Sequence, residues 1–166
     1  QKTRTSRIED NNVVDYKARR KIMVDTQIRP SDVTKFPIID AFLSVPREKF
    51  VPDGKREAAY IGENLQIGQN RVILDPRTLA KLLEALDVQK DELVLDIGTG
   101  LGYSSAVVSL IAEVVIAVED DSNLASEAEE ILSEIGADNV VVQVSKLKDG
   151  APEHGPYDVI ILQVGV

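Results

Sequence analysis

Four short apolar runs, separated by helix-length segments, occupy the second half of this 166-residue chain. The runs are rich in Val, Ile and Leu, and the segments between them carry apolar residues at helical spacing. Strands that alternate with helices predict an α/β fold with a doubly wound, mainly parallel sheet, because parallel neighbours need long crossover connections. The predicted strands are 93–97, 114–118, 140–144 and 157–162, and the predicted helices are 76–86, 103–111 and 122–135, with Ser122 as the cap of the last helix.

The first half of the chain predicts a helical extension ahead of this sheet. Residues 1–12 are polar without periodicity and predict a mobile arm. Helical periodicity from Val13 to Ile28 stops at Arg29-Pro30, and a second helix begins at Pro37 and ends at Pro46. Residues 47–75, with frequent Pro and Gly, predict loops. The predicted division is therefore an arm (1–12), a helical and loop region (13–75) and a sheet core (76–166).

Composition excludes several classes of function. The net charge of −9, from 19 basic and 28 acidic side chains, disfavours nonspecific nucleic-acid binding. Without cysteine and with one histidine, His154, the chain lacks the residues for a disulfide, a thiolate metal site or a multi-histidine metal site. The most apolar stretch, 106–118, is too short to span a membrane, and residues 1–12 lack the apolar run of a secretion signal. We therefore expect a cytoplasmic protein, with His154 in a solvated loop.

The segment Asp96–Tyr103 predicts a ligand site, because a strand there runs into a glycine-rich turn and then a helix. Ligands of such sheets bind at the carboxyl ends of the strands, and glycine lets a ligand approach the backbone. Asp96 lies just before the glycines, where a carboxylate would repel a pyrophosphate but attract an ammonium or sulfonium group. Tyr103 stands where a dinucleotide-binding fingerprint has its third small residue. Both residues favour S-adenosylmethionine over a nicotinamide dinucleotide.

Glu119 ends the next predicted strand and is placed to accept hydrogen bonds from ribose hydroxyls, which suits either class of nucleotide. The alternative is that Asp96 and Glu119 are solvated strand-end carboxylates beside a simple tight turn. The order of strand, turn, helix and two acids favours the ligand site. No metal ligands are predicted, and the candidate cofactor-binding residues are Asp96, Gly98, Thr99, Gly100, Gly102, Glu119 and Asp120.

Asp96 to Tyr103 resembles motif I of class I S-adenosylmethionine-dependent methyltransferases, and other segments resemble the protein-L-isoaspartate O-methyltransferase family. Met23–Arg29 is similar to that family's M-V-x-x-Q-I-R, and Val45–Pro52 to its V-P-R-E-x-F-V-P. Ala59–Pro76 aligns without gaps on A-Y-x-D-x-x-L-P-I-G-x-G-Q-T-I-S-Q-P, and Asp138-Asn139-Val140 matches its D-N-V.

The resemblance implies the Rossmann-like class I methyltransferase fold and methylation of a carboxylate on isoaspartyl residues of damaged proteins. The implied partner is a protein or peptide with a free carboxylate. Family members use a seven-stranded sheet, so three more strands are expected after the fourth predicted strand, beyond residue 166. Without them that strand would be an apolar, unpaired edge, which leaves a homodimer as an alternative.

The chain departs from the family pattern at several positions, most of them in the segment Ala59–Pro76. Leu74 stands at the family's active-site serine, Arg71 at a glutamine and Gly62 at an aspartate, and Ser145-Lys146 replaces the G-D whose acid faces adenine. Methylation of an ionised carboxylate needs alignment rather than a general base, so no catalytic residue is assigned. The alternative function is a weak or silent cofactor-binding relative with another acceptor or a regulatory role. For Arg71, a surface position is favoured over contact with a substrate carboxylate.

Overall fold

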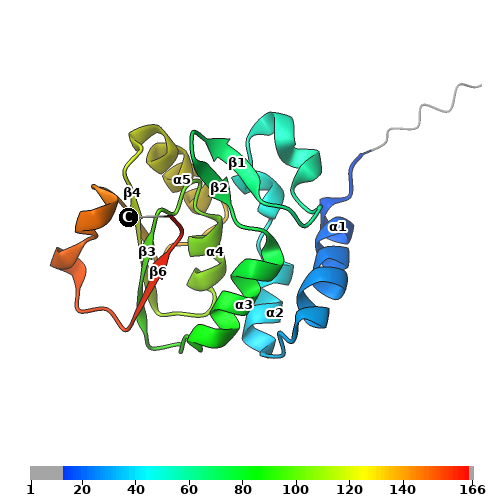
Figure 1. Cartoon of the computed structure of the whole chain (residues 1–166), viewed down its shortest axis with the longest axis horizontal. Helices are drawn as coiled ribbons and strands as arrows, with labels where there is room; N and C mark the ends of the chain where they lie inside the picture. The colour runs from blue at the N-terminus through cyan, green and yellow to red at the C-terminus, as the bar shows by residue number, and fades with distance from the viewer. Residues whose placement is uncertain (1–12, 165–166) are drawn as a thin grey trace, which may run out of the picture.

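A four-stranded parallel sheet forms the centre of the structure, a computed structural model in which residues 13–164 are described (Figure 1). Each predicted strand is confirmed, although the last begins at Val159 rather than at residue 157. The sequence alternation therefore gave the correct fold class. In their order across the sheet, the strands are β5 (Val140–Val144), β4 (Val114–Glu119), β3 (Leu93–Ile97) and β6 (Val159–Leu162).

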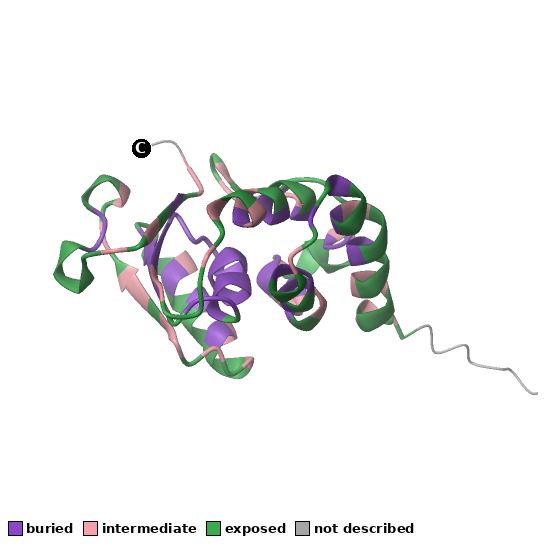
Figure 2. Cartoon of the chain, turned by 90° about the horizontal axis from the view of Figure 1, so that it is seen from below, coloured by how far each residue is buried: buried purple, intermediate pink, exposed green. Residues whose placement is uncertain are grey.

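Three helices cover one face of the sheet, and all three were predicted: α3 (Pro76–Leu86), α4 (Tyr103–Ser109) and α5 (Ser122–Glu134). Every residue of α4 is buried, so this helix forms the middle of the molecule (Figure 2). The other face packs against the segment 145–158, whose two short 3-10 turns, Leu147–Asp149 and Pro152–His154, cover β3 and β4.

The N-terminal helices pack against the far side of this helical layer. α1 (Tyr16–Met23) continues through a π-helical turn (Val24–Ile28), and α2 (Phe36–Ser44) follows, both as predicted. Asp15 caps α1 by accepting a hydrogen bond from the Ala18 amide. The predicted arm, residues 1–12, lies outside the described residues.

The prediction of loops for residues 47–75 is wrong in its most consequential part. Two short strands, β1 (Leu65–Gly68) and β2 (Arg71–Ile73), pair antiparallel there and form the β1–β2 hairpin, residues 65–73. Only Leu65 and Ile73 of the two strands are buried, which is too brief a pattern to reveal a strand from periodicity. The same region also contains 3-10 turns at Arg47–Phe50 and Asp53–Ala58.

A smaller correction concerns the start of α5. Asp121 caps this helix by accepting hydrogen bonds from the amides of Asn123 and Leu124, and Ser122 is its first helical residue. The predicted stop at Gly136 is confirmed, because its φ of +76° continues no right-handed helix.

β6 lies at one end of the described sheet and pairs there with β3. Its side chains Ile160 and Leu162 are exposed, as expected for an apolar edge strand. Among the described residues, no helix is long and apolar enough to cross a membrane.

Phe42 of α2 is expected to be a major source of stability, because its ring is fully buried and packs against Tyr103 of α4, with the two ring centroids 6.4 Å apart. Phe42→Ala should lower the free energy of unfolding by about 3–5 kcal/mol, measured by urea denaturation. Phe36 begins the same helix but is 74% exposed, so Phe36→Ala is the matched control and should change stability little. Equal losses in the two variants would contradict this packing.

Candidate functional site

The glycine turn, residues 98–102, joins β3 to α4 at the carboxyl end of the sheet, where the sequence placed it. Gly98, Gly100 and Gly102 have φ values of +81°, +61° and +96°, a region that side chains rarely adopt. The turn is held to the neighbouring strand, because the amides of Gly98 and Thr99 both donate to the Val118 carbonyl. The candidate residues on β3, β4 and the turn therefore lie together at the carboxyl ends of the two central strands.

Asp96 is completely buried, which overturns the alternative of a solvated strand-end carboxylate. Its Oδ2 accepts hydrogen bonds of 2.6 Å from both Ser104 and Ser105 of α4, and its Oδ1 accepts one of 3.1 Å from Gln163 after β6. Burial raises the pKa of Asp96, although these hydrogen bonds oppose the shift. Thr99 supports the arrangement through a 2.8 Å hydrogen bond with Ser105.

Glu119, the last residue of β4, is also completely buried and lies under the glycine turn. Its Oε1 accepts a 2.8 Å hydrogen bond from the Gly100 amide, and its Oε2 accepts one of 2.9 Å from the Asp121 amide. Arg71 of β2 donates to both oxygens, from Nη2 to Oε1 and from Nη1, at 2.9 Å, to Oε2. Burial acts to raise the pKa of Glu119, but Arg71 and the two amides outweigh it and hold that pKa below its ordinary value.

The prediction that Arg71 is a surface arginine is wrong. Its side chain is 13% exposed, and besides Glu119 it contacts Asp120 at 3.3 Å. Asp120, another candidate residue, is itself half exposed beside the glycine turn. The physical reason for the error is the β1–β2 hairpin, which folds over the turn and carries Arg71 onto a strand end about fifty positions further along the chain.

The hairpin closes the site that the candidate residues form. A Cβ added at Gly100 would lie 2.6 Å from Cδ1 of Ile67, so the hairpin rests directly on the glycine backbone. Between β2 and the turn a cavity of about 10 Å³ remains, lined by Leu74, Thr99 and Ser104 among others. Ligand sites are typically about 300–1,000 Å³, so a nucleoside does not fit between β2 and the turn in this arrangement.

Leu74, at the end of the hairpin, is held through its backbone rather than its side chain. The fully buried Arg47 donates from Nη2 to the Leu74 carbonyl at 3.0 Å and from Nε to the Ala59 carbonyl at 2.6 Å. Its guanidinium also lies 4.7 Å from the centroid of the Tyr103 ring. Tyr103 was the residue that argued against a dinucleotide site in the sequence analysis. In the structure its ring is buried beneath the site.

Sequence reasoning placed Arg71 at the surface and did not assign three further side chains to the site, namely Ser104, Ser105 and Gln163. The two serines carried a usable signal, because they lie in the first turn of the helix after the glycines, where a hydroxyl can reach the preceding strand. His154, by contrast, is exposed in a 3-10 turn and contacts none of the candidate residues.

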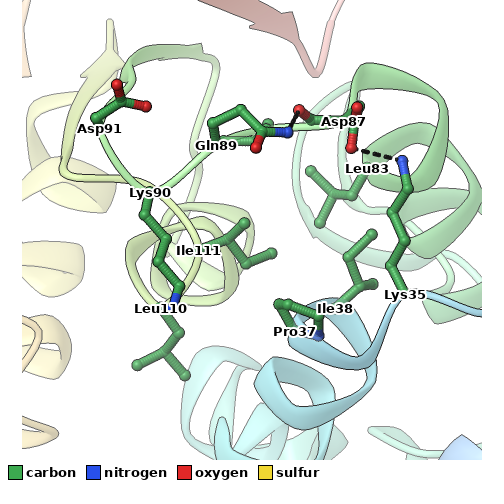
Figure 3. Close-up of a pocket in the computed structure, with 11 residues that line it drawn as sticks. Lys35, Pro37, Ile38, Leu83, Asp87, Gln89, Lys90, Asp91, Leu110 and Ile111 are labelled. Atoms are coloured by element: carbon green, nitrogen blue, oxygen red, sulfur yellow. Dashed lines mark hydrogen bonds and ion pairs between the residues drawn. The ribbon is translucent and has the colours of Figure 1, made fainter.

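A larger cavity, of about 490 Å³, lies at the opposite end of the sheet (Figure 3). Its floor is apolar, with Ile38, Leu83 and Ile111, and at its rim Lys35 pairs with Asp87 at 2.8 Å. It contains none of the candidate site residues. Residues 13–164 also hold no cluster of three or more His, Asp or Glu side chains that suits a metal ion.

Comparison with known proteins gives one consistent family. The family model of protein-L-isoaspartate(D-aspartate) O-methyltransferase matches residues 18–166. Protein-L-isoaspartate O-methyltransferase 1 of Syntrophobacter fumaroxidans is 33% identical over 92% of this chain and 72% of that protein. Protein-L-isoaspartate O-methyltransferase 2 of Pelobacter propionicus is 39% identical over 89% of this chain and 65% of that protein.

Solved structures agree with the fold. A protein-L-isoaspartate O-methyltransferase structure superposes with a TM-score of 0.78 and 28% identity, over 89% of this chain and 48% of that chain. A Plasmodium falciparum structure, described as a putative member of the same family in complex with S-adenosyl-L-homocysteine, superposes with a TM-score of 0.69 and 18% identity, over 90% and 73% of the two chains. The chain thus spans about half to three quarters of the length of these four proteins.

The buried ion pair predicts how stability depends on pH. Because the folded state lowers the pKa of Glu119 from its ordinary 4.5, its stabilisation is fully present above that value and is lost as the pH falls through the lowered pKa. Glu119→Gln should therefore lower the free energy of unfolding by about 3–5 kcal/mol at pH 7, and this loss should shrink in acid.

Urea denaturation of both proteins from pH 7 to pH 3 measures this difference. Glu127→Gln, on the exposed face of α5, is the matched control and should change stability little at any pH. A difference between wild type and Glu119→Gln that stays constant with pH would contradict the ion pair.

Proposed function

Since this chain belongs to the protein-L-isoaspartate O-methyltransferase family, we propose that it methylates a carboxylate of isoaspartyl residues in proteins, with S-adenosylmethionine as the methyl donor. One observation carries the proposal. Two fully buried carboxylates, Asp96 and Glu119, lie at the carboxyl ends of adjacent strands, beside a glycine turn with positive φ.

The chemistry of this donor set fits S-adenosylmethionine, although the hairpin must move to admit it. A buried carboxylate held by hydroxyl groups, as in Asp96, suits the ammonium group of the methionine moiety. Glu119 suits the two hydroxyls of a ribose. When bound, the cofactor supplies a methyl group on a cationic sulfur, which passes to a carboxylate oxygen as the sulfur leaves as a thioether.

The chain's own contribution is to bind and align rather than to move a proton. An acceptor carboxylate has a pKa of about 4 and is ionised at neutral pH, so it needs no general base. In the closed arrangement the β1–β2 hairpin and Leu74 cover the glycine turn, and Arg47 fixes the Leu74 backbone. Alignment of this kind contributes roughly 7–11 kcal/mol to lowering a barrier. We propose no catalytic side chain, and we assign the candidate cofactor-binding residues to this site.

We propose the same division as the sequence analysis, with one change. We propose that residues 76–166 form the cofactor-binding core and that residues 13–75 supply the acceptor side, now including the β1–β2 hairpin. A second candidate function is a cofactor-binding relative with weak methyl transfer. Leu74 favours it, because its side chain lines the closed cavity and offers no hydroxyl to orient an acceptor.

The direct test is incubation with methyl-labelled S-adenosylmethionine and an isoaspartyl peptide, with the matching aspartyl peptide as control. We expect a base-labile methyl ester on the isoaspartyl peptide only. Binding of S-adenosylhomocysteine by calorimetry without ester formation would support the second candidate. Neither binding nor ester formation would reject both.

The Asp96→Asn variant distinguishes a role of Asp96 in cofactor binding from a role in the stability of the fold. The variant should bind S-adenosylhomocysteine at least about tenfold more weakly, since a hydrogen bond to a charged group contributes about 1.5–3 kcal/mol. Its free energy of unfolding at pH 7 should be unchanged or higher, because burial raises the pKa of Asp96 and so penalises the charged form.

The pH profile checks the sign for Asp96. With its folded pKa above the ordinary 3.8, wild type should gain stability as the pH falls from that raised value toward 3.8, and Asp96→Asn should lack this gain. Asp91→Asn, an exposed change before β3, is the control for both measurements. Unchanged affinity in Asp96→Asn would remove Asp96 from the cofactor site.

A further inference from the structure

The carboxylate of Glu119 has no acceptor capacity left in this structure. Each of its oxygens accepts one backbone amide and one Arg71 nitrogen, which together make four hydrogen bonds. A carboxylate has about four lone-pair sites in all. A ribose diol could therefore reach Glu119 only if one of the present donors left.

Of these donors, Arg71 alone is a side chain, and it comes from the separate β1–β2 hairpin. The Gly100 and Asp121 amides belong to the backbone beside β4, whereas Arg71 sits next to the exposed tip of a hairpin. The base of the hairpin is anchored by the buried Leu65 and Ile73, which pair with each other. The tip, at Gln69 and Asn70, is exposed. Beside the tip, Arg71 and Ile67 contact the carboxyl end of the sheet, and Lys55 donates to the Gln66 carbonyl at 2.6 Å.

We propose that Arg71 is a latch that holds the β1–β2 hairpin closed over the nucleoside site by occupying both oxygens of Glu119. This proposal rests on the proposed function, in which Glu119 binds the ribose. The nucleoside and Arg71 then compete for one carboxylate, and the hairpin opens before the cofactor enters.

A latch and a purely structural ion pair predict different results when the pair is broken. Loss of either should lower the thermal stability of the free protein, but only loss of a latch should also raise the affinity for the ligand. Apparent affinity is reduced by the fraction of molecules that are competent to bind. If closed molecules outnumber open ones by about ten to one, Arg71→Gln should tighten S-adenosylhomocysteine binding about tenfold. Its thermal midpoint without ligand should fall below that of wild type.

Two measurements test the latch, with Arg29→Gln as the matched control because Arg29 forms an exposed ion pair with Asp25. The first is amide hydrogen exchange without ligand, in which residues 65–73 should exchange faster in Arg71→Gln than in wild type or the control. The second is calorimetric titration with S-adenosylhomocysteine, in which only Arg71→Gln should bind more tightly.

Arg71→Lys keeps the positive charge but loses the paired hydrogen bonds, so its affinity should lie between those of wild type and Arg71→Gln. This variant also provides the test if Arg71→Gln does not fold. Wild-type binding with equal or weaker binding by both Arg71 variants would overturn the latch alone. Hairpin exchange that is unchanged in both variants would overturn it as well. If neither wild type nor any variant binds the nucleoside, the proposed function is overturned. The latch is then overturned as well, because no nucleoside competes with Arg71 for Glu119.

Discussion

The buried carboxylate of Glu119 is the group on which the arrangement of the site depends. A carboxylate without solvent must be surrounded by donors, and each donor here comes from a different part of the chain. The glycine turn supplies one, the residue that caps α5 supplies another, and the β1–β2 hairpin supplies the arginine. A single acidic side chain thereby ties the hairpin to the carboxyl edge of the parallel sheet.

Burying two carboxylates at the carboxyl ends of neighbouring strands costs folding free energy, and the two side chains are stabilised in different ways. Burial raises the pKa of Asp96, which has only neutral donors to oppose it, whereas Arg71 and two backbone amides outweigh burial and hold the pKa of Glu119 below its ordinary value. The difference matches the groups that they are proposed to hold. Asp96 is left without a cation and so retains its attraction for the ammonium group, whereas Glu119 is already neutralised and must exchange its partner.

The sequence predicted the elements that repeat a simple pattern. Strand and helix alternation gave the sheet, and the order of Asp96, the glycines and Glu119 gave the two acids and the turn between them. The hairpin escaped prediction because its strands are four and three residues long with one buried side chain each. Without the hairpin, Arg71 had no visible partner, since its contact with Glu119 joins residues 48 positions apart. A local pattern carries no information about such a contact.

A crystal structure of this chain with S-adenosylhomocysteine would show whether Glu119 exchanges Arg71 for a ribose. We expect ribose hydroxyls within hydrogen-bond distance of Glu119, the amino group beside Asp96, and the Arg71 guanidinium withdrawn with the hairpin tip. A nucleoside bound elsewhere, with Arg71 still paired to Glu119, would contradict this exchange.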